Sequence, residues 1–371
     1  MSKWEMVKWS EVVEIKNGRN QKAVEDRNGQ YPIYGSGGVM GYANDYLCEE
    51  ETVIIGRKGN INKPIYVSEK FWNVDTAFGL STKKNILNSR FLYFFCVNFN
   101  FEKLNTTVTI PSLTKSNLLN ISIPLPPLET QKQIAKTLDT AAELLAMCKQ
   151  QLAELDNLIK STFYDMFGDL AFNDKQWVTR ALFEICKDNS DIKCGPFGTQ
   201  LSKDEYQTSG VPLWGISQIN TFFRSPTKEF LTEEKAISLE AYSIIPNDIT
   251  MSRKGNVGKC ALYPVDFPTG IMHSDLLRIR VNQEIVNSHF ILHQLHLSGY
   301  IQNQIKLVSG GAIMAGINVT KLKHIMVHVP PFTLQNQFAD IVIKIEEQKA
   351  LVKKAIDETQ YLFDSLMSEY F

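Results

Sequence analysis

The sequence predicts an α+β protein: two similar mixed α/β domains in a pseudo-twofold arrangement, separated by two long helices that form an antiparallel coiled coil. Three observations predict it: the chain contains an internal repeat, each copy ends in a long amphipathic helix, and 371 residues exceed what one hydrophobic core usually supports. The expected segments are a first domain at 1–128, a spacer helix at 129–170, a second domain at 171–331 and a spacer helix at 332–371.

The repeat is clearest in its helical part. Residues 126–167 and 330–371 align without a gap at an offset of 204, which matches Gln131 with Gln335 and Phe167 with Phe371. Self-similarity over such a length indicates duplicated architecture.

Shorter matches continue upstream in the same order. Ile15–Gly18 pairs with Ile192–Gly195, Pro32–Gly35 pairs with Pro212–Gly215, and the tetrapeptide RKGN occurs at 57–60 and again at 253–256. The offset grows along the chain, as expected for related halves that carry different loop insertions.

Each spacer helix has one narrow apolar stripe, because its apolar residues alternate steps of four and three, which is a coiled-coil heptad pattern. In the second helix Lys349 and Thr359 interrupt the stripe. The seam residues are Ile134, Leu138, Leu145, Leu152, Leu155 and Ile159 in the first helix and Phe338, Val342, Ile345, Val352, Ile356 and Phe363 in the second.

The order of the segments sets the direction of pairing. The first helix leads from domain one to domain two and the second begins at domain two, so helices that pair must run antiparallel. At about 1.5 Å per residue, each would extend roughly 57 Å. The alternative is two independent amphipathic helices, each lying on its own domain.

The globular segments mix short strand-like runs with a few helical stretches, broken by Gly, Asn and Pro. This pattern predicts a mixed, largely antiparallel sheet with peripheral helices. Prolines cannot sit inside a helix, so Pro126, Pro127, Pro330 and Pro331 mark the points where each domain ends and its helix begins.

Most catalytic signatures are missing from the sequence. It has no GxxxxGK[ST] phosphate loop and no GxGxxG motif. His289, His293 and His296 have metal-like spacing without the glutamate of a zinc protease, and are interpreted as packed or surface histidines. Val329–Phe332 is similar to an amino-methyltransferase tetrapeptide, but it starts with Val and fits a helix entry better. We therefore predict no catalytic residue, metal or cofactor in this chain.

Composition is that of an ordinary soluble protein, with 44% hydrophobic and 21% charged residues. Six cysteines without a CxxC pair, and no secretory signal or membrane-length apolar stretch, favour a cytoplasmic location. A net charge of −1 lacks the basic balance usual for nucleic-acid binders, so any such binding must come from local groups.

The repeated RKGN loops are the candidate nucleic-acid contacts. Each offers two cations, a glycine that permits close backbone approach and an amide able to bond bases or phosphates. The alternative is a hairpin turn with solvated charges. The full candidate set is Lys16, Arg19, Ser36, Arg57, Lys58 and Asn60 in the first half and Lys193, Thr199, Gln200, Arg253, Lys254, Asn256 and Lys259 in the second.

With these residues, the chain resembles, over essentially its whole length, the DNA-specificity subunit of a type I restriction-modification enzyme. The similar features are a Trp-containing segment opening each domain, Pro-Pro followed by Gln-x-Gln closing it, and the loops KCGPFGTQL at 193–201 and SRKGNVGK at 252–259. The first half departs from the pattern because it reads KNGRNQKAV where the second has the GPFG segment.

The resemblance implies a non-catalytic subunit. Its two target-recognition domains would each read half of a split site in double-stranded DNA, and its helices would set the spacing and dock two methyltransferase subunits. S-adenosylmethionine would bind the methyltransferase, and ATP and magnesium would bind a restriction subunit where one joins.

Two alternatives belong to other classes. A duplicated enzyme would need a reactive cluster that the sequence does not display. A duplicated coiled-coil scaffold that binds protein partners without reading DNA would fit the helices, but leaves the repeated cationic loops unexplained.

Overall fold

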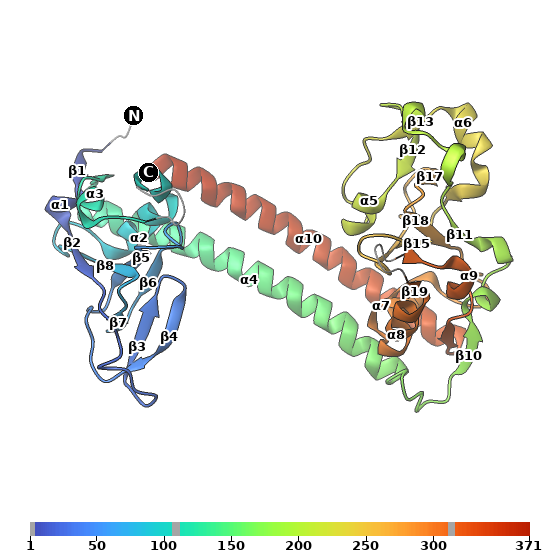
Figure 1. The fold of residues 1–371 in the computed structure, drawn as a ribbon, viewed down its shortest axis with the longest axis horizontal. Helices are drawn as coiled ribbons and strands as arrows, with labels where there is room; N and C mark the ends of the chain where they lie inside the picture. The colour runs from blue at the N-terminus through green and yellow to red at the C-terminus, as the bar shows by residue number, and fades with distance from the viewer. Residues whose placement is uncertain (1–3, 106–111, 311–315) are drawn as a thin grey trace. The chain divides into compact units, whose positions relative to one another are not determined.

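The protein was analysed as a computed structural model that describes residues 4–105, 112–310 and 316–371. Its chain divides into two compact units (Figure 1). Unit 1 comprises Met1–Gln151 and Val352–Phe371, and unit 2 comprises Leu152–Leu351. Each unit is a mixed α/β domain that includes part of both long helices, which confirms the predicted fold class.

Unit 1 has a four-stranded antiparallel sheet, a three-stranded sheet and a two-stranded pair. In the three-stranded sheet β3 pairs with β7 in parallel and with β4 antiparallel. The strands in sheet order are β2 (Val13–Asn17), β8 (Ala77–Thr82), β5 (Thr52–Gly56) and β6 (Ile65–Val67); β4 (Gly38–Ala43), β3 (Tyr31–Gly35) and β7 (Trp72–Asn73); and β1 (Met6–Lys8) with β9 (Ser122–Pro124). Its short helices are α1 (Trp9–Val12), α2 (Ser89–Asn98) and α3 (Lys115–Leu119).

Unit 2 repeats this plan with different loops. The strands in sheet order are β11 (Ile192–Cys194), β18 (Leu276–Ile279), β15 (Ile249–Ser252) and β16 (Cys260–Leu262); β13 (Phe230–Leu231), β12 (Val211–Trp214), β17 (Gly270–Met272) and β14 (Ser243–Ile244); β10 (Val178–Ala181) with β21 (Met326–Val329); and β19 (Ser309–Gly310) with β20 (Gly316–Ile317). Its short helices are α5 (Ile216–Asn220), α6 (Glu233–Ser238), α7 (Ser288–Leu297), α8 (Gly299–Val308) and α9 (Val319–Leu322).

The two units share their sheet topology. The order β2-β8-β5-β6 corresponds to β11-β18-β15-β16, and the parallel pair β3-β7 corresponds to β12-β17. The expected largely antiparallel sheet is therefore divided in each unit into several sheets, one of which contains a parallel pair. Parallel strands need a long crossover connection. The chain between β3 and β7 includes β5 and β6, and the chain between β12 and β17 includes β15 and β16, which in each unit belong to a different, four-stranded sheet.

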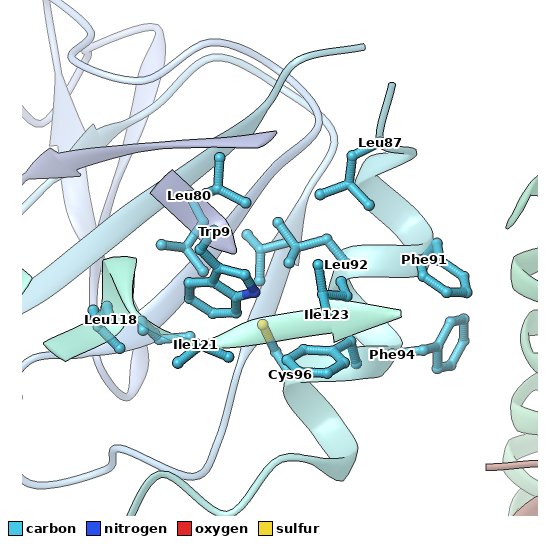
Figure 2. Close-up of a cluster of buried hydrophobic side chains, with 14 of the residues drawn as sticks. Trp9, Leu80, Leu87, Phe91, Leu92, Phe94, Cys96, Leu118, Ile121 and Ile123 are labelled. Atoms are coloured by element: carbon cyan, nitrogen blue, oxygen red, sulfur yellow. The ribbon is translucent and has the colours of Figure 1, made fainter. Parts of the chain in front are cut away.

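The core of unit 1 surrounds Trp9, which is fully buried. Its indole ring contacts Phe95 and Phe101, with ring centroids 6.0 and 6.3 Å away. Figure 2 shows the ring between strand residue Leu80 and Ile121, with helix α2 beside it. Removing a buried side chain of this size costs about 3–5 kcal/mol, so Trp9 is central to the stability of unit 1.

The two long helices are α4 (Leu128–Phe167) and α10 (Phe332–Tyr370). In unit 1, Ile134 and Leu138 of α4 share a core with Met367 of α10. In unit 2, the rings of Phe163 and Phe338 lie 5.6 Å apart. The beginning of each helix thus packs against the end of the other, so the helices are paired and antiparallel within each unit rather than independent.

Within this pairing, the seam residues are buried except for Leu152, Ile356 and Phe363, which are half-buried. Lys349 is also buried, and its ammonium group contacts Asp156 at 2.6 Å and hydrogen-bonds to Glu346. Burial acts to lower the pKa of Lys349, but these two carboxylates outweigh it and raise the pKa above its ordinary value. Lys349, which interrupts the apolar seam, is therefore charged, and the two carboxylates compensate the cost of burying its ammonium group.

Among the described residues, no helix is both long and apolar enough to cross a membrane.

Candidate nucleic-acid interface

The two RKGN loops have the same backbone conformation. Gly59 and Gly255 lie in the left-handed region with φ of 77° and 68°, which glycine adopts without steric cost. The residue after each glycine is spanned by a tight turn, in which the amide of Ile61 or Val257 donates to the glycine carbonyl at 2.8 Å. The glycine of this motif is therefore required by the turn.

Each loop is held in place by two distant segments of its own unit, through equivalent hydrogen bonds. The amide of Arg57 donates to the carbonyl of Thr76 at 2.8 Å, and the amide of Arg253 donates to the carbonyl of Asp275 at 2.8 Å. Each arginine carbonyl also accepts a backbone hydrogen bond, from Leu113 in unit 1 and Ile317 in unit 2. The backbone of each loop is thus fixed on both sides.

In unit 1 the side chains of this loop are exposed. Arg57, Lys58 and Asn60 all lie at the surface. The guanidinium of Arg57 lies 5.8 Å from the ring centroid of Phe78. The side-chain amide nitrogen of Asn60 lies beside Gly37 in the β3-β4 turn. It is 3.8 Å from the position that a Cβ atom on that glycine would take. The loop therefore adjoins the β3-β4 hairpin.

The remaining unit 1 candidates lie on the neighbouring strand and turn. Lys16 and Arg19 line an open hollow of about 380 Å³ together with Leu47. Ser36 is half-buried in the β3-β4 turn. Unit 1 therefore presents a cationic hollow and a cationic loop.

In unit 2, two loops far apart in sequence are linked by aromatic rings. The ammonium of Lys193 lies 4.6 Å from the ring centroid of Tyr242, whose hydroxyl donates to Gln200 at 3.0 Å. The guanidinium of Arg253 lies 4.7 Å from the ring centroid of Phe197. Stacking of this kind orients a cation and attracts it to the ring, so the GPFG loop fixes the arginine of the RKGN loop.

The other unit 2 candidates have different partners. Lys254 forms a 2.8 Å ion pair with Asp275. Lys259 donates to the carbonyl of Asn220 at 3.0 Å and lies 5.3 Å from the ring centroid of Phe222. The side chain of Asn256 reaches that of Asn220 at 3.5 Å. Thr199 is exposed within the short helical turn Gly198–Gln200.

Several residues of this surface were missed by sequence reasoning. Tyr242, Asp275 and Asn220 contact the candidate cations but belong to other segments, and no repeat or motif marks them. The exposed ring of Phe222 also carries no sequence signal, because phenylalanine is most often a core residue.

The histidines of the metal-like spacing share a hollow of unit 2 with Phe222. His289, His293 and His296 line a hollow of about 410 Å³ together with Lys349 and Glu346. Burial lowers the pKa of all three imidazoles, that of His293 to about 4, so they are neutral near pH 7. Nowhere in the described parts of the chain does a group of three or more His, Cys, Asp or Glu side chains have a geometry that could hold a metal ion.

The fold and these loops define a duplicated α+β protein with a cationic loop in each unit, and comparison with known proteins gives its family. The family described as "Type I restriction modification DNA specificity domain" matches residues 1–157 and 174–360. The chain therefore belongs to the type I restriction-modification DNA specificity family.

Curated relatives agree with this assignment. A putative type I restriction enzyme specificity subunit of Haemophilus influenzae is 26% identical, covering 92% of this chain and 88% of its own length. A putative type I restriction enzyme MjaX specificity subunit of Methanocaldococcus jannaschii is 25% identical, covering 96% and 87%. These matches support a role in DNA specificity within a type I restriction-modification system rather than that of a scaffold without DNA readout.

Solved structures support the fold. The type I restriction-modification S subunit from M. genitalium superposes with a TM-score of 0.70 at 18% identity, covering 100% of this chain and 96% of its own. A chain from a structure describing complex assembly and conformational transition of a type I system superposes with a TM-score of 0.56 at 15% identity, covering 99% and 97%.

Proposed function

We propose that each unit reads one half of a split, asymmetric site in double-stranded DNA, and that the chain itself catalyses no reaction. The observation that carries this proposal is the pair of RKGN loops, which have the same anchored backbone but different surroundings. Arg253 stacks on Phe197 of the GPFG loop, whereas Arg57 lies near Phe78 of strand β8. A common framework with different neighbours suits two modules that read different bases.

The side chains fit two roles in DNA binding. Exposed cations such as Arg57 and Lys58 can contact phosphates, which supplies affinity and makes it dependent on salt. Arg253 is already oriented by stacking, and an oriented guanidinium can bond two acceptors on a guanine edge. Lys254 would have to exchange Asp275 for a DNA acceptor, so we expect it to contribute less than Arg253.

The long helices have repeated apolar residues on their exposed faces. Met147 and Leu351 are 204 positions apart and 59% and 70% exposed, and Leu158 and Leu362 form a second such pair. Singly exposed apolar residues are common on protein surfaces, so the recurrence of these two pairs at the repeat offset is what supports the inference. Because they recur at the repeat offset, they suit two copies of one partner, and we infer that these partners are two methyltransferase subunits.

Catalysis and its cofactors then belong to the partners. The methyltransferase would bind S-adenosylmethionine and flip the target base out of the duplex, as enzymes that modify a stacked base must. The paired helices α4 and α10 would set the spacing of the two half-sites. Restriction subunits, with ATP and magnesium, would join where restriction accompanies modification.

The test is a map of N6-methyladenine across the genome of the native host, with and without this gene. We expect deletion to remove methylation at one motif, made of two unlike half-sites and a fixed spacer. A single uninterrupted palindrome, or no change although the protein is expressed and bound to methyltransferase subunits, would contradict the proposal.

A further inference from the structure

The two units differ beside their RKGN loops, at the segment that follows the matched motifs Pro32–Gly35 and Pro212–Gly215. In unit 1 the chain turns at Gly37 and returns as strand β4. In unit 2 it forms helix α5 and then a turn at Thr221–Arg224. The common framework therefore carries unlike insertions at the same point.

Both insertions lie against the asparagine of the RKGN loop. In unit 1, Asn60 adjoins Gly37 in the turn. In unit 2, the side chain of Asn256 contacts Asn220 at the end of α5, and Lys259 donates to the carbonyl of the same residue. The insertions are therefore continuous with the candidate DNA contacts of each unit.

Each insertion also exposes apolar side chains that a folded protein normally buries. Val39 and Met40 on β4 are 54% and 64% exposed, and Phe222 after α5 is 48% exposed. Tyr42, further along β4, is exposed as well. Apolar groups displayed beside cations suit a partner that has both negative charge and apolar edges.

The turn that displays Phe222 is built under backbone strain. Phe222 and Phe223 both have positive φ, at 52° and 59°, which is rare for bulky residues. Phe223 is buried against Trp214, with ring centroids 5.4 Å apart, and its amide donates to the carbonyl of Gln218 at 2.7 Å. Burial of Phe223 thus holds the turn while Phe222 faces outward, and such strain is typical of functional sites.

We propose that segments 36–43 and 216–224 are the specificity-determining elements of the two units, and that Met40 with Val39, and Phe222, contact base edges. This inference rests on the proposed function and names the residues that distinguish its two half-sites. Apolar side chains read DNA through contact with the thymine methyl group or by wedging between base steps. The adjoining RKGN loops would provide the shared phosphate and amide contacts.

The experiment uses the full chain assembled with its methyltransferase subunits. Competition binding on duplexes with single base-pair changes would be measured for the wild type, Met40→Ala and Phe222→Ala. We expect Met40→Ala to reduce discrimination about tenfold at one or two positions of one half-site, and Phe222→Ala to do so in the other half-site only.

Matched controls separate this effect from general damage. Met6→Ala and Phe172→Ala remove the same side chains from other exposed positions of units 1 and 2, and should leave discrimination unchanged. Phe222→Asn also removes the ring, but asparagine tolerates positive φ, so the turn should be preserved. Its loss of discrimination should therefore match that of Phe222→Ala.

Three outcomes would overturn the inference: unchanged discrimination in both variants, equal loss of affinity for every duplex, or loss of the methyltransferase subunits on purification, which would make these segments a protein interface. Absence of any specific binding by the wild-type complex would instead mean that the proposed function itself fails.

Discussion

Gln131 and Gln335 lie 204 positions apart and share two equivalent side-chain hydrogen bonds. Each is fully buried near the start of its long helix. Gln131 accepts from the amide of Asn88 at 2.8 Å and donates to the carbonyl of Pro126 at 2.8 Å. Gln335 accepts from the amide of Asn287 at 2.9 Å and donates to the carbonyl of Pro330 at 2.8 Å. Each therefore joins a long helix to the N-terminus of α2 or α7.

Replacing either glutamine with leucine should destabilise its own unit. Gln131→Leu leaves a buried amide and buried carbonyls without their partner, at a cost of about 1–3 kcal/mol for each such group. We expect faster hydrogen exchange at α2 in Gln131→Leu and at α7 in Gln335→Leu, measured by mass spectrometry. The neighbouring Gln133, which is exposed, provides the control, and Gln133→Leu should have little effect. Unchanged protection in all variants would contradict this role.

Arg253→Ala should impair recognition of one half-site only. The stacked guanidinium belongs to unit 2, so the half-site read by unit 1 should keep its discrimination. If Arg253 contacts bases, discrimination at one position should fall by about 1–3 kcal/mol. If it contacts phosphate, the slope of binding against salt should fall by about one instead. Arg57→Ala should affect the other half-site, and loss at both half-sites from either variant would argue against separate modules.

Tyr242 should act by positioning Gln200 and Lys193. Tyr242→Phe removes the hydroxyl that donates to Gln200 but keeps the ring beneath Lys193. Tyr242→Ala removes both contacts, so it should weaken binding of the cognate duplex more than Tyr242→Phe does. Equilibrium binding of the assembled complex at two salt concentrations would check this order. Equal effects of the two variants would assign no role to the ring.

Unit 2 should lose stability when the pH falls below about 6.5, because it contains four histidines, His289, His293, His296 and His328, whose pKa is lowered by burial. Burial lowers the pKa of His293 from 6.5 to about 4 in the folded state, and His296, His289 and Lys349 face it and lower it further. Between these values the unfolded state binds more protons than the folded state, so acid favours unfolding. The loss saturates below about pH 4, at about 3 kcal/mol for this group.

The measurement is hydrogen exchange of α7 and α2 from pH 7 to pH 5, corrected for intrinsic exchange rates. Protection should fall more in α7 than in α2. The matched variant is His293→Phe, because Phe94 occupies the corresponding position of α2 and packs against Phe363 there. It should reduce the pH dependence of α7, and an undiminished dependence would show that His293 is not its source.

Features encoded by local spacing could be predicted from the sequence. The paired prolines predicted the helix entries, and α4 and α10 begin directly after them at Leu128 and Phe332. The heptad pattern predicted the stripe of each helix, and the repeat predicted two related domains. These properties depend on residues a few positions apart or on direct comparison of two segments.

The surroundings of the candidate site were decided by tertiary structure alone. Tertiary packing brings Tyr242 to Gln200 and Asp275 to Lys254, across separations that no local pattern spans. The display of Phe222 depends on burial of its neighbour Phe223, although both residues look alike in the sequence. The sequence by itself determined the duplication, the helices and the cationic loops. Only packing determined which cations are stacked, paired or free, because that depends on residues brought together from distant parts of the chain.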